Sequence, residues 1–303
     1  MIIYGSDNPG AVIYIQYFLT KSRFERKKIK KIKNLEKLKK NINFLITGSA
    51  IGKTLDKEIV AWGKRKKIPT ISIIEDWKNF KKRFIIKKKI YYPDFIFVVD
   101  DYAKKLAIKE GLPSKKILIS GNDYLKNLIK KKNKYNFKIN NKKNILFISE
   151  PLSEDNPNKP LAEFGYDEFK TLDLILKNRL KGYKLTVKLH PRETIKKYFR
   201  YKDQVKFIRI KNLKKILKNY DIIIGMNSML LLELGLYRND IISFRPNSNN
   251  NFYGGKFGLT KNIEKEKQLR NLLRIKPKND NRRFIKSIIS TNINADNLLK
   301  SIK

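Results

Sequence analysis

The sequence predicts an α/β protein of two Rossmann-like domains, each built on a parallel sheet. Short apolar runs alternate with longer helical patterns from end to end, which is typical of βαβ units. The chain has 303 residues, a length that favours two domains. One polar segment without periodicity, residues 131 to 143, divides the series of runs in two. We therefore expect a domain over residues 1–135 and a second over residues 144–303.

The first half contains five apolar runs that we interpret as strands, with a helix after most of them. They cover residues 1–5, 43–47, 70–75, 94–99 and 116–120. The second half repeats this arrangement at residues 144–149, 184–190, 206–210, 221–225 and 240–244. The last 25 or so residues form an amphipathic pattern, so we expect a terminal helix that packs back on one of the domains.

Composition limits the function classes. Lys and Arg number 70 against 28 Asp and Glu, a net charge of +42 that favours anionic partners. The basic residues are mostly lysines spread along the chain, which indicates a general bias rather than one site. There is no cysteine, which excludes disulfides and thiolate chemistry. No secretory signal or membrane-spanning run is visible, so we expect a cytoplasmic protein. A second option is that it associates peripherally with an anionic membrane.

The segment ITGSAIGKT, residues 46–54, resembles a phosphate-binding P-loop but has the wrong spacing. Such a loop needs four residues between its first glycine and the Gly-Lys pair, whereas Gly48 and Gly52 enclose three. The segment is better explained as the turn between a strand and a helix. We expect Gly48, Ser49 and Lys53 to form a loop on the acceptor side of a cleft, where a helix N-terminus meets an anion.

His190, the single histidine, is the first candidate for chemistry. It stands at the carboxyl end of a predicted strand in VKLHPRE, where open α/β sheets place ligand-binding groups. An imidazole between Lys188 and Arg192 can donate a hydrogen bond or a proton to a leaving phosphate. The alternative is a histidine that only caps a turn.

A second candidate group lies in DIIIGMNSMLLLELG, residues 221–235. The predicted strand ends at Gly225, and Asn227 and Ser228 precede a helix whose N–H groups can hold an anion. Glu233 lies on that helix, where its carboxylate can accept from sugar hydroxyls. The alternative is that Ser228 is a simple helix cap. The loop SEPLSED adds Ser149 as a further phosphate contact, with an ordinary polar loop as its alternative.

These two motifs, over roughly residues 144–246, resemble the carboxyl half of GT-B glycosyltransferases, above all bacterial sialyltransferases and capsular polysaccharide transferases. The resemblance implies that His190 contacts the donor phosphate, that Ser228 binds the same phosphate and that Glu233 meets the ribose. Those families often have a second hydroxyl residue beside the serine, and Met229 stands there instead. The resemblance also implies a CMP-linked donor, a cleft between the two domains and a catalytic base in the first domain.

The predicted base lies in SIIEDWKNFKKRF, residues 72–84. Glu75 and Asp76 follow a predicted strand, and we prefer Asp76, although Glu75 stays open. Arg83 is nearby, and Asn122 in ISGNDYLKNL is expected to line the cleft, since that segment resembles a unit shared by GT-B enzymes and nucleotide-sugar 2-epimerases.

The sequence thus predicts a metal-independent, inverting glycosyltransferase without a cofactor. Its partners would be a nucleotide-sugar donor and a glycan or lipid-linked glycan acceptor, with no specific nucleic acid. No Asp-x-Asp motif is placed to hold a metal. Two alternatives stay open: a hydrolysing nucleotide-sugar 2-epimerase, and a basic nucleic-acid-binding protein.

Overall fold

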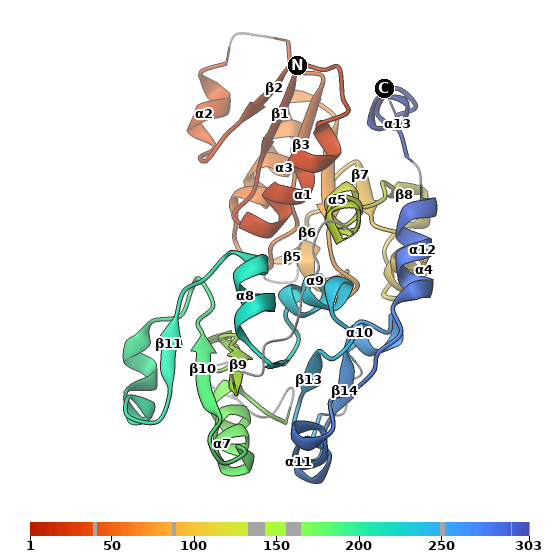
Figure 1. The fold of residues 1–303 in the computed structure, drawn as a ribbon. Coiled ribbons are helices and arrows are strands. Elements are labelled where there is room, and N and C mark those ends of the chain that lie inside the picture. The colour runs from red at the N-terminus through yellow and green to blue at the C-terminus, as the bar shows by residue number, and fades with distance from the viewer. Residues whose placement is uncertain are drawn as a thin grey trace. The chain divides into compact units, whose positions relative to one another are not determined.

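Two six-stranded sheets, all parallel, form the centres of two separate units (Figure 1). The computed structural model describes residues 1–38, 41–86, 89–132, 143–155, 165–248, 252–291 and 293–302. The first unit comprises Met1–Asn127 with Ser287–Lys303, and the second comprises Leu128–Lys286. The predicted fold class, α/β with two parallel-sheet domains, is confirmed.

The first unit has the strand order β2-β1-β3-β4-β7-β8. Its strands are β1 (Ile2–Gly5), β2 (Arg26–Lys28), β3 (Phe44–Thr47), β4 (Thr70–Ile74), β7 (Phe95–Val98) and β8 (Ile117–Ile119). A separate antiparallel pair joins β5 (Ile85–Ile86) and β6 (Lys89–Ile90). The helices are α1 (Pro9–Leu19), α2 (Lys33–Glu36), α3 (Leu55–Lys66) and α4 (Asp101–Lys109), with 3₁₀ turns at Lys82–Phe84 and Ser114–Lys116. Helix α5 (Asp123–Lys132) begins in the first unit, and its last residues belong to the second.

The second unit has the strand order β11-β10-β9-β12-β13-β14. Its strands are β9 (Asn144–Ile148), β10 (Lys184–Lys188), β11 (Lys206–Ile208), β12 (Ile222–Gly225), β13 (Ile242–Phe244) and β14 (Lys261–Ile263). Its helices are α6 (Leu152–Asp155), α7 (Glu168–Asn178), α8 (Leu213–Asn219), α9 (Met229–Tyr237), α10 (Tyr253–Lys256) and α11 (Glu266–Arg274), with a 3₁₀ segment at Ile195–Tyr201. Helix α12 (Arg282–Ser290) follows, and α13 (Ala295–Lys300) ends the chain.

Both faces of the first sheet are buried, which explains its continuous apolar strands. On one face Ile2 and Ile46 belong to a core with Phe18 of α1. On the other face Ile3 and Leu45 pack with residues of α3. The ten strands predicted from the sequence are all present, each within two residues of the predicted bounds. Burial of apolar side chains is the physical reason that most of these runs were visible, whereas β11 has no fully buried residue.

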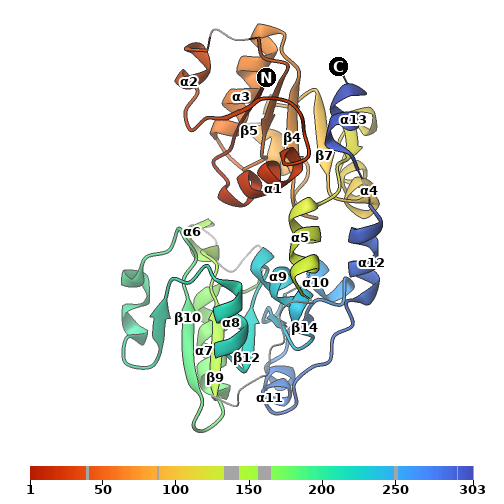
Figure 2. The ribbon, with the colours of Figure 1, turned by 45° about the horizontal axis from the view of Figure 1, so that its top comes forward.

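The chain end packs in the first unit (Figure 2). Ala295 and Leu299 of α13 are buried in the core that contains Ile2. Asp296 accepts hydrogen bonds from the backbone N–H of Arg23, at 3.0 Å, and from the Ser22 hydroxyl, at 2.9 Å. The expected return of a terminal helix is therefore confirmed, but residues 287–303 lie with the first unit rather than within the predicted domain 144–303.

The strands that the sequence analysis missed lie at sheet edges or outside the sheets. β2 consists of Arg26–Lys28, three exposed residues without apolar alternation. β14 contains one buried apolar side chain, that of Ile263. Neither pattern differs from that of a polar loop. Of the linker predicted at 131–143, residues 133–142 lie outside the described residues.

Candidate functional site

The carboxyl edge of the second sheet brings the second-half candidates together. β9 pairs with β10 on one side and with β12 on the other, so the three strand ends are neighbours. Ser149 follows β9, and His190 follows β10. Ser228 follows β12 and begins α9. Because these strands are parallel, residues far apart in sequence meet at one edge.

The imidazole of His190 is held in one orientation by its own turn. Its Nδ1 accepts a hydrogen bond from the backbone N–H of Arg192 at 3.2 Å. The backbone N–H of His190 donates to Glu193 Oε2 at 2.7 Å. Since Nδ1 acts as an acceptor, the proton of the neutral ring is assigned to Nε2. A neutral His190 can thus donate a hydrogen bond through Nε2.

The buried carboxylate of Glu193 stabilises this turn. Its side chain is fully buried and its Oε1 accepts from the hydroxyls of Ser149, at 2.9 Å, and Tyr198, at 2.8 Å. Lys197 forms an ion pair with the same oxygen at 2.8 Å. The Ser149 hydroxyl therefore supports the carboxylate that holds the His190 turn, which differs from the phosphate contact expected from the sequence.

The turn after β12 is organised by local hydrogen bonds. Ser228 is the N-cap of α9, and its Oγ accepts from Leu230 N at 3.2 Å. The backbone N–H of Asn227 donates to Glu150 Oε1 at 2.6 Å, and its side-chain amide donates to the Tyr166 hydroxyl. The Glu150 carboxylate thus lies directly before the helix whose N–H groups were expected to hold an anion.

Lys188 and Glu233 interact electrostatically at the same edge. Burial lowers the pKa of Lys188, while Glu193 and Glu233 oppose that change. Glu233 on α9 and Lys188 at the end of β10 are therefore close enough to influence each other's charge. Arg192 is exposed, whereas Gly225 is buried at the end of β12. A Cβ on Gly225 would lie 3.0 Å from the Leu231 side chain, so the small residue allows α9 to begin tightly there.

In the first unit, Glu75 is a buried carboxyl group whose pKa is raised. The residue is 6% exposed, and its Oε1 accepts a hydrogen bond from Asn8 Nδ2 at 2.6 Å. Its Oε2 has no hydrogen-bond partner among the residues that the structure describes. Burial is the main cause that raises the pKa of Glu75, against the opposing charge of Arg83. A buried carboxyl with a raised pKa is suited to gain and release a proton.

Arg83 connects three other predicted residues of this unit. Its Nη1 donates to Ser49 Oγ at 3.2 Å and lies 4.0 Å from Glu75 Oε1. Its Nη2 donates to Asp76 Oδ2 at 3.5 Å. Asp76 also accepts from Trp77 N at 2.7 Å. The four predicted residues Ser49, Glu75, Asp76 and Arg83 therefore form one buried polar group at the carboxyl ends of β3 and β4.

The loop from Gly48 to Lys53 differs from the anion-binding loop expected from the sequence. The N–H of Leu55 at the start of α3 donates to Asp7 Oδ2 at 2.6 Å. The helix N-terminus is therefore already capped by a carboxylate. A Cβ on Gly48 would lie 2.5 Å from Ser6 Oγ, so the glycine is required by close packing with the loop after β1.

Asn122 also has a structural contact. Its Oδ1 accepts from Leu125 N at 2.9 Å and so caps α5. Its side-chain nitrogen has no hydrogen-bond partner within the described part of the chain.

Sequence reasoning missed Asn8, Glu150, Tyr166 and Arg245. Arg245 is 1% exposed, lies directly after β13 and pairs with Glu264 at 3.6 Å. The segment ISFRP did show a charged residue at a strand end, which was a usable signal. Asn8 and Glu150 gave no comparable signal, because their contacts join segments 67 and 77 residues apart.

Comparison with known proteins shows relatives in fold only. No family model and no curated protein sequence matches the chain. Among solved structures, the UDP-GlcNAc 2-epimerase of Methanocaldococcus jannaschii, in complex with UDP-GlcNAc and UDP, matches with a TM-score of 0.60. That match has 12% identity and covers 99% of this chain and 98% of that one.

Two further solved structures match the fold of this chain to a similar degree. MnaA of S. aureus, solved with UDP, gives a TM-score of 0.58 at 15% identity over 97% of this chain and 91% of that one. The UDP-GlcNAc 2-epimerase of Neisseria meningitidis, bound to UDP-GlcNAc, gives a TM-score of 0.57 at 13% identity. That match covers 99% of this chain and 97% of that one. The fold is thus the broad GT-B-like arrangement of these enzymes.

The expected glycosyltransferase was wrong. Several solved structures that match over nearly their whole length are UDP-GlcNAc 2-epimerases, which are isomerases, and not sialyltransferases or capsular polysaccharide transferases. The motifs that suggested a transferase, a His-Pro turn and a serine before a helix, are features of strand ends that this fold offers to different enzymes.

Proposed function

We propose that the protein is a nucleotide-sugar 2-epimerase that binds a UDP-linked sugar. The observation that supports this proposal is that nearly the entire chain matches UDP-GlcNAc 2-epimerases in fold. Several of the matching structures were solved with UDP or UDP-GlcNAc. The alternative that the sequence left open, an epimerase, now becomes the main proposal. The ligands in those structures favour UDP over the CMP-linked donor expected from the sequence.

The second unit offers groups suited to the nucleotide. The Nδ1 of His190 accepts a backbone hydrogen bond, which assigns the donor role to its Nε2. Lys188 supplies positive charge at the same edge, and Glu233 on α9 offers a carboxylate to a ribose hydroxyl. We assign His190 and Lys188 to the diphosphate, since a developing phosphate charge is stabilised by fixed donors.

The first unit offers a group suited to the proton transfer. Inversion at a carbon that carries hydrogen requires that this hydrogen leave and that a proton return on the other face. Glu75 is the better candidate than Asp76, because burial raises its pKa and one of its oxygens lacks a partner among the described residues. Asp76 accepts hydrogen bonds from Arg83 and Trp77, which suits a positioning role.

The experiment is incubation with UDP-GlcNAc in D₂O, followed by proton NMR. An epimerase loses the C2 proton signal of the sugar and produces the C2 epimer with deuterium at that carbon. Glu75→Gln should abolish the exchange while retaining UDP binding, and His190→Ala should weaken UDP binding. Asp76→Asn serves as the matched comparison, with a smaller loss of exchange. Intact UDP-GlcNAc without exchange, from a protein that binds no UDP, would contradict the proposal.

Nucleotide preference is tested separately by thermal shift with UDP, CMP, GDP and CDP. A ligand that binds only the folded state at about 100 times its Kd adds about 2.7 kcal/mol of stability. We expect UDP to give the largest shift. A larger shift with CMP would restore the preference predicted from the sequence and would place the epimerase substrate outside the UDP-sugars.

A further inference from the structure

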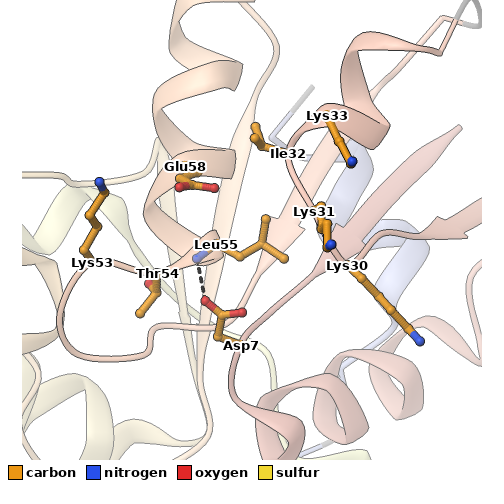
Figure 3. Close-up of a pocket in the computed structure, with 9 residues that line it drawn as sticks. All are labelled: Asp7, Lys30, Lys31, Ile32, Lys33, Lys53, Thr54, Leu55 and Glu58. Carbon is orange, nitrogen blue, oxygen red and sulfur yellow. Dashed lines mark hydrogen bonds between the residues drawn. The ribbon is translucent and has the colours of Figure 1, made fainter.

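A hollow of about 530 Å³ opens at the carboxyl edge of the first sheet, and its lining includes none of the residues assigned to the epimerase function. Figure 3 shows Lys53 on one side and three lysines on the other, with Asp7 and Leu55 between them. The lining residues are Asp7, Lys30, Lys31, Ile32, Lys33, Lys53, Thr54, Leu55 and Glu58. The hollow is therefore assembled from the segments that follow β1, β2 and β3.

Its place in the sheet is one where α/β proteins bind ligands. β1 pairs with β2 on one side and with β3 on the other, so the chain reverses its direction of travel across the sheet at β1. The crevice outside such a reversal is the common binding position in open parallel sheets. The volume also lies within the roughly 300–1,000 Å³ that is typical of small-molecule sites.

The charges that line the hollow indicate an anion. Its four lysines are exposed, and none has a carboxylate within ion-pair distance among the residues that the structure describes. Lysines elsewhere do find such partners, as Lys21 does with Asp123 at 3.1 Å.

Two carboxylates also line the hollow. Asp7 is engaged with the N–H of Leu55, while Glu58 is exposed. Four ammonium groups against these two carboxylates leave a positive site.

Protection of an edge strand does not explain this arrangement. β2 lies at the edge of the sheet, and Lys27 and Lys28 within it are the kind of residue that prevents edge-to-edge pairing. Lys30 and Lys31 lie beyond that strand, and Lys53 comes from the loop after β3. Lysines from separate segments converge on one hollow, which edge protection alone does not require.

We propose that this hollow binds a small anion that carries at least two phosphate groups, of the pyrophosphate class. The lysines supply charge, and the apolar side chains of Ile32 and Leu55 line the wall between them. The inference goes beyond the proposed epimerase function and does not depend on it, because the UDP-sugar is assigned to other residues. It also gives Lys53 of the ITGSAIGKT segment an anion-binding role that the helix N-terminus, capped by Asp7, does not supply.

The test is calorimetric titration of the full chain with inorganic pyrophosphate at about 0.15 M salt, where the Debye length is about 8 Å. We expect saturable binding of one pyrophosphate. The double variant Lys31→Gln/Lys53→Gln should bind about tenfold more weakly, a loss typical of two removed surface charges. Glu58→Gln should bind more tightly, since a like charge is removed. UDP binding should stay unchanged in all of these variants.

The matched control is Lys105→Gln/Lys109→Gln, which removes two exposed lysines from α4 of the same unit. An equal loss in this control would overturn the proposal, because it would show non-specific attraction to a highly basic chain. Competition between pyrophosphate and UDP for one site would also overturn it. A third experiment measures binding to phosphatidylglycerol vesicles. If the native chain binds no pyrophosphate and the Lys31→Gln/Lys53→Gln variant loses vesicle binding, the lysines bind a lipid surface instead.

Discussion

Glu75 makes the stability of the first unit depend on pH. Burial raises its pKa above the ordinary value of 4.5, so the folded state favours the protonated form. Its contribution to stability is complete below the unfolded pKa and is lost as the pH rises through the raised folded pKa. In Glu75→Gln, this dependence is absent because the amide does not titrate.

We therefore expect the free energy of unfolding of the native chain, relative to Glu75→Gln, to fall as the pH rises above 4.5 and to level off above the raised pKa. Each unit of pKa change corresponds to about 1.4 kcal/mol. Urea unfolding over a pH series measures the difference. A difference that is constant with pH would show that Glu75 is not perturbed.

The charge of Glu150 is expected to weaken UDP binding. Its carboxylate accepts the backbone N–H of Asn227 at 2.6 Å, directly before the Ser228 cap of α9. A phosphate that approaches this turn meets a like charge. Glu150→Gln keeps a hydrogen-bond acceptor and removes the charge, so UDP should bind about three- to tenfold more tightly, as expected for one partly screened charge. Calorimetric titration with UDP measures this, and a weaker affinity in the variant would show that Glu150 contacts the ligand favourably.

At the scale of elements, α9 depends on a close approach at Gly235. A Cβ there would lie 2.3 Å from the backbone oxygen of Leu259. Gly→Ala inside a helix normally stabilises by about 0.5–1 kcal/mol. Here we expect the opposite sign, a loss of about 1–3 kcal/mol, because backbone must shift to admit the methyl group. Since α9 begins at the Asn227–Ser228 turn, UDP affinity should fall as well. Thermal unfolding of Gly235→Ala decides the sign, and stabilisation would contradict the packing described.

Most strands that were predictable from the sequence have side chains that are buried on both faces. β3, with four buried residues from Phe44 to Thr47, was visible as an apolar run. β2 has three exposed basic residues and is held by backbone pairing to β1, which leaves no pattern in the sequence. The helix start at Leu55 was also visible, but its cap was not, because Asp7 lies 48 residues away.

The same limit applies to the candidate site. Strand-end position indicated His190, Ser228, Glu75 and Asp76, since a strand followed by a turn can be recognised locally. The contacts that decide what those residues do, such as Glu150 with Asn227 and Asn8 with Glu75, join distant segments. Local motifs therefore predicted the edge of the sheet but not the reaction, and the transferase expectation failed for that reason.

At the scale of the whole molecule, the net charge of +42 bears on association as well as on stability. Among the described residues no helix is long and apolar enough to cross a membrane. Peripheral association with an anionic membrane stays a prediction. The surface on which to test it is formed by seven lysines that line the hollow described above and a second one, of about 400 Å³, that shares Lys30 with it. They are Lys27, Lys28, Lys30, Lys31, Lys33, Lys37 and Lys53.

The same charge predicts that salt stabilises the folded chain. Seventy basic residues repel one another more strongly in the compact state than in the extended one, so unfolding relieves part of this repulsion. Raising the ionic strength from about 0.01 to 0.1 M shortens the Debye length from about 30 to 10 Å and screens it. We expect Tm to rise by several degrees over that range, measured by calorimetry in NaCl and in KBr without phosphate in the buffer. Equal rises in the two salts indicate screening. A Tm that stays constant or falls would mean that ion pairs such as Lys197 with Glu168, at 2.7 Å, outweigh the repulsion among the lysines.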